Sequence, residues 1–215
     1  MYKKYEKVLL EECGIDFNRY ITVLANNGNT TGIYADVALL LYRLVRFSGT
    51  NSVLEFGSGM STLILSKACM DYGKNLVVGE SGRKWYNITK VCLDALSLNS
   101  RGFVCTDSDE SKFPVLDGPV SLVWVDGTVS EVQGPGYNRL GSCEYYWNSI
   151  KGACLLFDDS ESAYMSGIKP VLEQNGRSDD SYFLFNPTGR GDRQVLVSVP
   201  ESGEQFLDVV KSCIL

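Results

Sequence analysis

Histidine is absent from all 215 residues of the chain. Its absence excludes every mechanism in which an imidazole activates a serine or a cysteine, and every metal site that histidine ligates. A general base in this protein therefore has to be Asp, Glu, Lys, Tyr or a metal-bound oxygen. The carboxylates become the first candidates for chemistry.

Strongly basic segments and long apolar runs are absent as well. With 20 basic and 26 acidic residues the net charge is −6, so we expect no nucleic-acid partner, because nucleic-acid phosphates require a basic surface. The most apolar stretch, Val37–Val45, is interrupted by Arg43 and is too short to span a bilayer. We therefore expect no membrane contact.

Paired cysteine motifs are also missing. The chain has seven cysteines, an odd number, and none of them forms a C-x-x-C pair, which argues against a disulfide framework or a zinc cluster. The charged N-terminus lacks the apolar core of a signal peptide. Together these features predict a protein of the reducing cytoplasm.

Apolar strand-like runs alternate with helix-like segments along the chain. Five such strands between helices predict an α/β protein with a parallel sheet covered on both faces. The last two apolar runs are separated by PTGRGD and predict an antiparallel hairpin. The predicted strands are 52–56, 75–80, 102–107, 120–127, 152–160, 181–186 and 193–199, and the predicted helices are 2–12, 32–47, 61–71, 82–98 and 162–175.

Carboxylates stand at or near the ends of the first five predicted strands. In a parallel sheet, ligands bind at the carboxyl ends of the strands, where the strand order reverses. Six acids at this one edge are hard to attribute to solubility alone. They are Glu55, Glu80, Asp107, Asp126, Asp158 and Asp159.

The first strand runs into a glycine turn, in NSVLEFGSGMSTLIL. Gly57 and Gly59 permit a sharp strand-to-helix turn and a close approach of the backbone to a ligand. Glu80 ends the next strand, at a spacing typical of an acid that accepts both ribose hydroxyls. Both NAD and S-adenosylmethionine fit a glycine turn followed by such an acid. The alternative is a turn that serves only packing.

The residue at the third position of the glycine motif separates the two cofactors. NAD requires G-x-G-x-x-G, because its pyrophosphate rests against the helix N-terminus, and Thr62 stands where the third glycine belongs. S-adenosylmethionine carries no phosphate, has a carboxylate for the loop N–H groups, and brings a sulfonium that favours nearby acids. The sequence therefore favours S-adenosylmethionine over NAD.

From residue 30 onward the chain resembles a class I S-adenosylmethionine-dependent methyltransferase. The motifs VLEFGSGMST, VVGE, LVWVDG and LLFDDS carry the resemblance in this order. They are closest to the methyltransferase 24 and catechol-type O-methyltransferase group. The resemblance implies a Rossmann-like seven-stranded sheet of order 3-2-1-4-5-7-6 with strand 7 antiparallel. It also implies a single domain, 1–215, in which the helical segment 1–48 packs on or caps the cofactor site.

Carried over onto this chain, the resemblance implies a cofactor site at the strand ends. Glu80 holds the ribose, and Asp107 or the adjacent Ser108 lies near the adenine. Asp126 lies under the transferred methyl group. The full set of implied cofactor-binding residues is Glu55, Gly57, Ser58, Gly59, Ser61, Glu80, Asp107, Ser108 and Asp126.

The resemblance also suggests a metal at Asp126, Asp158 and Asp159, which match the acids that hold a divalent ion in catechol-type enzymes. An all-oxygen site suits Mg²⁺, which would lower the pKa of a substrate hydroxyl and aim it at the methyl group. Asp126 and Asp158 are then the catalytic residues. The alternative is that Asp126 touches the cofactor and that the other two acids end a strand beside water. The lysine that follows this acid in catechol-type enzymes is missing from DGTVSEVQ.

The segment from Gly127 to Tyr145 is long for a strand-to-helix connection and stands where a substrate would enter. Tyr137 and Arg139 are candidate substrate contacts, with an incidental surface loop as the alternative. We expect methyl transfer from S-adenosylmethionine to a small molecule, at a hydroxyl oxygen. A non-catalytic binding module and an NAD-dependent oxidoreductase are the alternatives, and the oligomeric state is open, with a homodimer among the choices.

Overall fold

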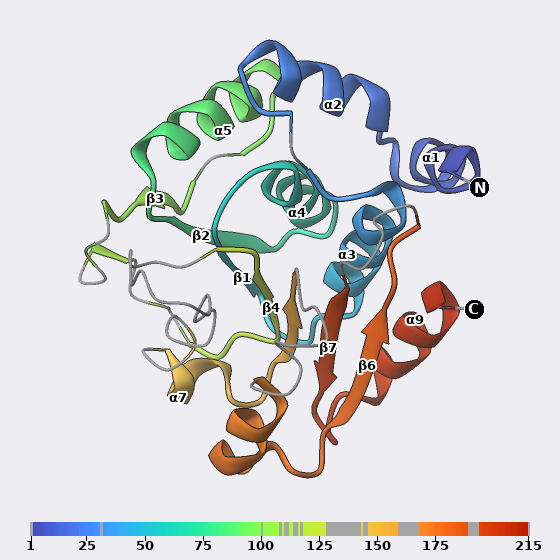
Figure 1. Cartoon of the computed structure of the whole chain (residues 1–215), viewed down its shortest axis with the longest axis vertical. Helices are drawn as coiled ribbons and strands as arrows, with labels where there is room; N and C mark the ends of the chain where they lie inside the picture. The colour runs from blue at the N-terminus through green and yellow to red at the C-terminus, as the bar shows by residue number, and fades with distance from the viewer. Residues whose placement is uncertain are drawn as a thin grey trace.

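The structure of the protein is a computed structural model. It describes residues 2–30, 32–99, 101–107, 109, 112–113, 116, 118–127, 143, 146–158, 168–188 and 194–214, with only the backbone of Tyr2 and Ile214. Within these residues the chain forms one mixed sheet with helices packed against it (Figure 1).

The sheet has seven strands in the order β3-β2-β1-β4-β5-β7-β6, as the resemblance implied. β7 runs antiparallel to both of its neighbours, β5 and β6, and the remaining paired strands are parallel. The predicted order and direction are thus confirmed. The strands are β1 (Ser52–Phe56), β2 (Asn75–Glu80), β3 (Phe103–Cys105), β4 (Leu122–Val125), β5 (Cys154–Phe157), β6 (Ser181–Phe185) and β7 (Val195–Val199).

Three of the described helices were not predicted from the sequence: α2 (Phe17–Asn26), α7 (Trp147–Ile150) and α9 (Glu204–Ile214). α2 begins at the N-cap Asp16, whose carboxylate accepts a hydrogen bond from the backbone N–H of Arg19. The predicted helix 162–175 is described from 168 and runs into η2 (Glu173–Arg177). The other helices are α1 (Tyr2–Cys13), α3 (Ala35–Phe47), α4 (Met60–Asp71) and α5 (Arg83–Ala95).

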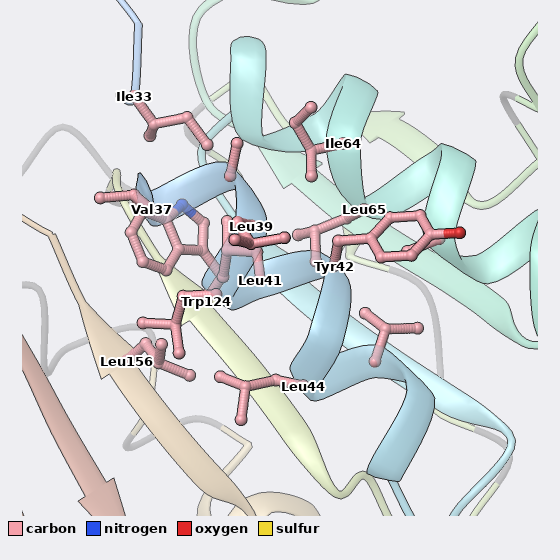
Figure 2. Packing of buried hydrophobic residues seen from close by; sticks show 14 of the residues in the cluster. Ile33, Val37, Leu39, Leu41, Tyr42, Leu44, Ile64, Leu65, Trp124 and Leu156 are labelled. Carbon is pink, nitrogen blue, oxygen red and sulfur yellow. The ribbon is translucent and has the colours of Figure 1, made fainter. Parts of the chain in front are cut away.

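The central strands are buried on both faces, as a parallel sheet between helices requires. Alternate residues of β4 enter different cores: Trp124 packs with the residues of α3 and α4, whereas Val123 and Val125 face the second core. Figure 2 shows the indole of Trp124 beside Val37, with Leu156 of β5 below it. Each core fixes the sheet from one side, and the strand ends are thereby held in place.

The N-terminal helices lie along one side of the sheet. α1 packs on α3, α2 packs on α4 and α5, and α9 returns to pack on α3. Figure 1 shows the two ends of the chain on the same side of the molecule. Among the described residues, no helix combines the length and the apolar character that crossing a bilayer requires.

Candidate functional site

The turn after β1 is shaped by a contact between two backbones. Gly57 has a φ of +93°, and a Cβ at this position would lie 2.7 Å from the backbone N of Gly127, in the turn after β4. The N–H groups of Asp126 and Gly127 both donate to the carbonyl of Phe56 at 2.9 Å. Gly57 is therefore required by packing between the two strand ends, in addition to any role toward a ligand.

Gly59 faces a more open space. The nearest atom to a Cβ placed there would be Asn29 Nδ2, at 3.8 Å, and a Cβ on Gly32 would lie 3.2 Å from Met60 Cβ. The connection between α2 and α3 therefore passes beside the glycine turn. This position is compatible with the predicted capping role of segment 1–48, which stays a prediction.

Glu55 is a fully buried carboxyl group at the end of β1. Ser61 Oγ donates to its Oε1 at 2.5 Å, whereas no described residue donates to Oε2. Burial raises the pKa of Glu55 well above its usual range, Ser61 opposes this rise, and the charge of Asp126 adds to it. The structure thus places a buried carboxyl group directly behind the glycine turn.

The pKa of Glu55 predicts how the stability of the protein depends on pH. The folded pKa lies above the unfolded value, so the wild-type free energy of unfolding falls as the pH rises from about 4.3, the ordinary glutamate pKa, toward the folded pKa. Glu55→Gln should flatten this fall between pH 5 and pH 8, measured by urea unfolding, because the amide does not titrate. Glu201→Gln, an exposed control, should keep the wild-type slope. Equal slopes in all three proteins would contradict the prediction.

Glu80 ends β2 with its carboxylate directed at the glycine turn. Ser58 Oγ donates to Oε2 and the backbone N–H of Gly82 donates to Oε1, both at 2.7 Å. Glu80 is only 6% exposed, and burial raises its pKa while these hydrogen bonds oppose the rise. These hydrogen bonds bring the predicted ribose-binding acid and the glycine turn together.

Two residues beside Glu80 were not predicted from the sequence. A Cβ on Gly82 would lie 3.1 Å from Trp85 Cδ1 and 3.4 Å from Glu80 Oε1. The Trp85 indole and the Glu80 carboxylate therefore both lie close to Gly82. Trp85 is 37% exposed. Thr89, one turn further along α5, is fully buried and lies 3.2 Å from Ser58 Oγ. The sequence signal that could have identified Trp85 and Thr89 is their position in the helix that directly follows Glu80.

Asp107 follows β3 and is held by a neighbouring guanidinium. Arg83 Nε donates to Oδ1 at 2.9 Å and Arg83 Nη2 donates to Oδ2. The Cys105 thiol also donates to Oδ1, and the thiol and Arg83 together lower the pKa of Asp107. Since Cys105 pairs with Glu80 in the sheet, Asp107 lies at the same edge as the ribose-binding candidate. Its role at an adenine stays a prediction, and Ser108 lies outside the described residues.

Asp126 and Asp158 follow neighbouring strands at equivalent positions. Val125 pairs with Phe157, and each is followed by one of the two acids. Asp158 is 1% exposed and Asp126 is half-buried. No group of three metal-ligating acids, cysteines or histidines occurs within the described part of the chain, and Asp159 lies outside that part. The two described acids alone could provide oxygen ligands, and the three-acid site stays a prediction.

The segment predicted to admit substrate is largely outside the described residues, including Tyr137 and Arg139. Tyr146, near its end, is a core residue: its ring packs against Phe56 and Phe113 at centroid distances of 5.8 Å and 4.8 Å. Phe113 in turn covers Gly79 of β2, where a Cβ would lie 1.5 Å from its ring. These rings hold the second face of the sheet beneath the strand ends.

Comparison with known proteins shows similarity at the level of fold. No family model matches the chain, and no curated protein matches it. The solved structures that it resembles include Rv0187 from MTB with bound cofactor, with a TM-score of 0.64, 15% identity and coverage of 93% of this chain and 96% of that one.

Two further similar structures are O-methyltransferases. The enzyme from Bacillus cereus in complex with SAH (S-adenosylhomocysteine) gives a TM-score of 0.63 and 17% identity, over 93% of this chain and 100% of the other. TomG from Streptomyces achromogenes, involved in tomaymycin synthesis and in complex with SAM (S-adenosylmethionine), gives 0.58 and 18%, over 93% and 98%. The chain therefore has the Rossmann-like fold of class I methyltransferases.

Proposed function

We propose that the protein transfers a methyl group from S-adenosylmethionine to a hydroxyl oxygen of a small molecule. The observation that carries the proposal is the buried Glu80 carboxylate, which the Ser58 hydroxyl and the Gly82 N–H hold at the glycine turn. The similar structures from Bacillus cereus and Streptomyces achromogenes are O-methyltransferases in complex with SAH and SAM, which supports both the cofactor and the oxygen acceptor.

The residues around the turn fit this cofactor in both charge and shape. Glu80 accepts the ribose hydroxyls, and Gly59 leaves room for the methionine portion beside Ser61. Glu55, buried behind the turn, is the acid nearest to the cationic part. The cofactor itself supplies an activated methyl group. The remaining implied contacts are Gly57, Ser58, Asp107, Ser108 and Asp126, with segment 1–48 as the cap.

The acceptor side of the site is built from the ends of β4 and β5. Asp126 and Asp158 orient the acceptor hydroxyl, and with Asp159 they form the candidate Mg²⁺ site. Methyl transfer is an in-line displacement, so positioning contributes much of the rate, on the order of 7–11 kcal/mol in favourable cases. Tyr137 and Arg139 remain the candidate substrate contacts.

The setting of the protein is part of the proposal. All seven cysteines are free in the structure, which fits the reducing cytoplasm. The acidic net charge fits a small-molecule substrate better than a nucleic acid. A homodimer stays an open alternative.

A turnover assay tests the proposed reaction. The protein is incubated with S-adenosylmethionine and a panel of phenols, catechols and hydroxy acids, and formation of S-adenosylhomocysteine is measured with Mg²⁺ or with EDTA. We expect acceptor-dependent turnover that EDTA and Asp158→Asn each reduce on the order of 100-fold, because a bound cation contributes several kcal/mol. Asp208→Asn, exposed on α9, should retain full activity.

The same assay distinguishes the alternatives. If EDTA leaves turnover unchanged, the proposed metal site is wrong and the proposed methyltransferase activity stands. Binding of the cofactor without product from any acceptor would favour a binding module. Binding of NADH in place of S-adenosylmethionine would favour an oxidoreductase and would overturn the proposal.

A further inference from the structure

We infer that Thr89, acting through Ser58, positions the Glu80 carboxylate for the sugar hydroxyls of the bound nucleoside. The inference rests on the proposed function, because it concerns the same cofactor site. It adds the middle of α5 to that site, a part of the chain that carries no recognised motif. Thr89 is thus a positioning residue for cofactor binding and touches no reacting atom.

The direction of the hydrogen bonds follows from the number of protons. Ser58 Oγ lies 2.7 Å from Glu80 Oε2 and 3.2 Å from Thr89 Oγ1. A serine hydroxyl has one proton, and the carboxylate, which can only accept, takes it. The contact between the two hydroxyls is therefore donated by Thr89. The result is a chain in which Thr89 donates to Ser58 and Ser58 donates to the carboxylate, and each bond polarises the next.

Burial makes this chain effective. Thr89 is fully buried, Glu80 is 6% exposed and Ser58 is half-buried, so little water competes for these bonds. The backbone N–H of Gly82 holds the other carboxylate oxygen at 2.7 Å. α5 thus restrains both oxygens of Glu80, one through its N-cap residue and one through Thr89. The restraint fixes the direction in which the two oxygens face, and two neighbouring ribose hydroxyls can each donate to one of them.

The test compares two ligands by isothermal titration: S-adenosylhomocysteine and its 2′,3′-dideoxy analogue. The wild-type protein should prefer the hydroxylated ligand by about 100-fold, since two hydrogen bonds to a charged group are lost in the analogue. Thr89→Val removes the donor and keeps the shape, and it should reduce this preference to about 10-fold. Affinity for the dideoxy analogue should stay within about twofold of wild type.

Ser58→Ala interrupts the same chain one step closer to Glu80. It should lower the preference at least as far as Thr89→Val does, and the double variant should match Ser58→Ala alone, because residues acting in series are not additive. Thr89→Ser restores the hydroxyl and should restore the preference. Ser212→Ala is the matched control, since Ser212 is exposed on α9 and donates to the carbonyl of Val209.

The outcomes separate this inference from the proposed function. If the wild-type protein prefers the hydroxylated ligand and Thr89→Val keeps the full preference, the inference is wrong and the function stands. If Thr89→Val weakens the binding of both ligands equally, Thr89 has a packing role and the inference is also wrong. If the wild-type protein binds neither ligand, the proposed function itself fails. Should Thr89→Val fail to fold in a thermal melt, Ser58→Ala decides, and an unchanged preference there refutes the inference.

Discussion

Glu80→Ala is expected to lower the affinity for S-adenosylhomocysteine by at least about 100-fold, because a hydrogen bond to a charged group contributes roughly 1.5–3 kcal/mol and the ribose offers two hydroxyls. The carboxylate is buried and already oriented by Ser58 and Gly82. Little ordering of the side chain is therefore needed when the ligand arrives, and most of the interaction energy should appear as affinity. Isothermal titration calorimetry measures the change.

Two further variants make the Glu80 result interpretable. Glu80→Gln keeps the side-chain shape and one acceptor oxygen, and its loss of affinity should be smaller than that of Glu80→Ala. Glu201→Ala lies in an exposed turn and should bind like the wild type. If Glu80→Ala leaves the affinity unchanged, Glu80 does not bind the ribose, even though the protein binds the ligand.

Arg177→Met is expected to lower the free energy of unfolding by about 3–5 kcal/mol, since it leaves a buried carboxylate without its counter-ion. Arg177 is 2% exposed and its Nε lies 2.5 Å from Asp180 Oδ2. Its Nη2 also donates to the carbonyl of Ala153 at 2.8 Å and to Ser198 Oγ at 3.2 Å. One guanidinium therefore ties η2 to the start of β5 and to β7.

The stability effect is measured by urea unfolding followed by circular dichroism. In a chain of this size it corresponds to a fall of roughly 10 °C in the melting temperature. Arg177→Met combined with Asp180→Leu should recover much of the loss, because removing both charges costs less than removing one. Arg101→Met, at an exposed position, should change stability by less than about 0.5 kcal/mol. A loss below about 1 kcal/mol for Arg177→Met alone would show that the buried pair contributes little net stability.

The sheet was predictable because its strands are buried on both faces. Runs such as Leu122–Val125 are continuously apolar, and such runs between helices leave few arrangements of a parallel sheet. The strand ends were less predictable: the apolar run 102–107 forms only the short strand Phe103–Cys105. Backbone geometry gives the reason, because Asp107 has a φ of +48° and leaves the extended conformation.

Two of the three missed helices, α2 and α9, each bury one narrow stripe of side chains. α2 buries Phe17, Tyr20 and Leu24, which are spaced by three and four residues. α9 buries Phe206 and Val210 in the same manner. Both stripes follow the helical period, so a search for this spacing over shorter windows would have found them.

The site residues that belong to motifs at strand ends could be predicted from the sequence. The site residues that come from helices and from connections between helices could not. Glu80 ends β2 and Ser58 follows the adjacent parallel strand β1, so the topology alone brings them together. Thr89 and Asn29 reach the same place from a helix face and from a connection between helices. Neither carries a motif, and only the packing of α2 and α5 determines where they lie.

The most direct test of the proposed cofactor site is a crystal structure of the protein grown with millimolar S-adenosylhomocysteine. The proposal predicts both ribose hydroxyls within about 3 Å of the Glu80 carboxylate oxygens, with the homocysteine portion beside Gly59. A nucleoside bound away from this edge, with Ser58 and Gly82 as the sole partners of Glu80, would contradict it. Absence of the ligand from crystals grown in its presence would do the same.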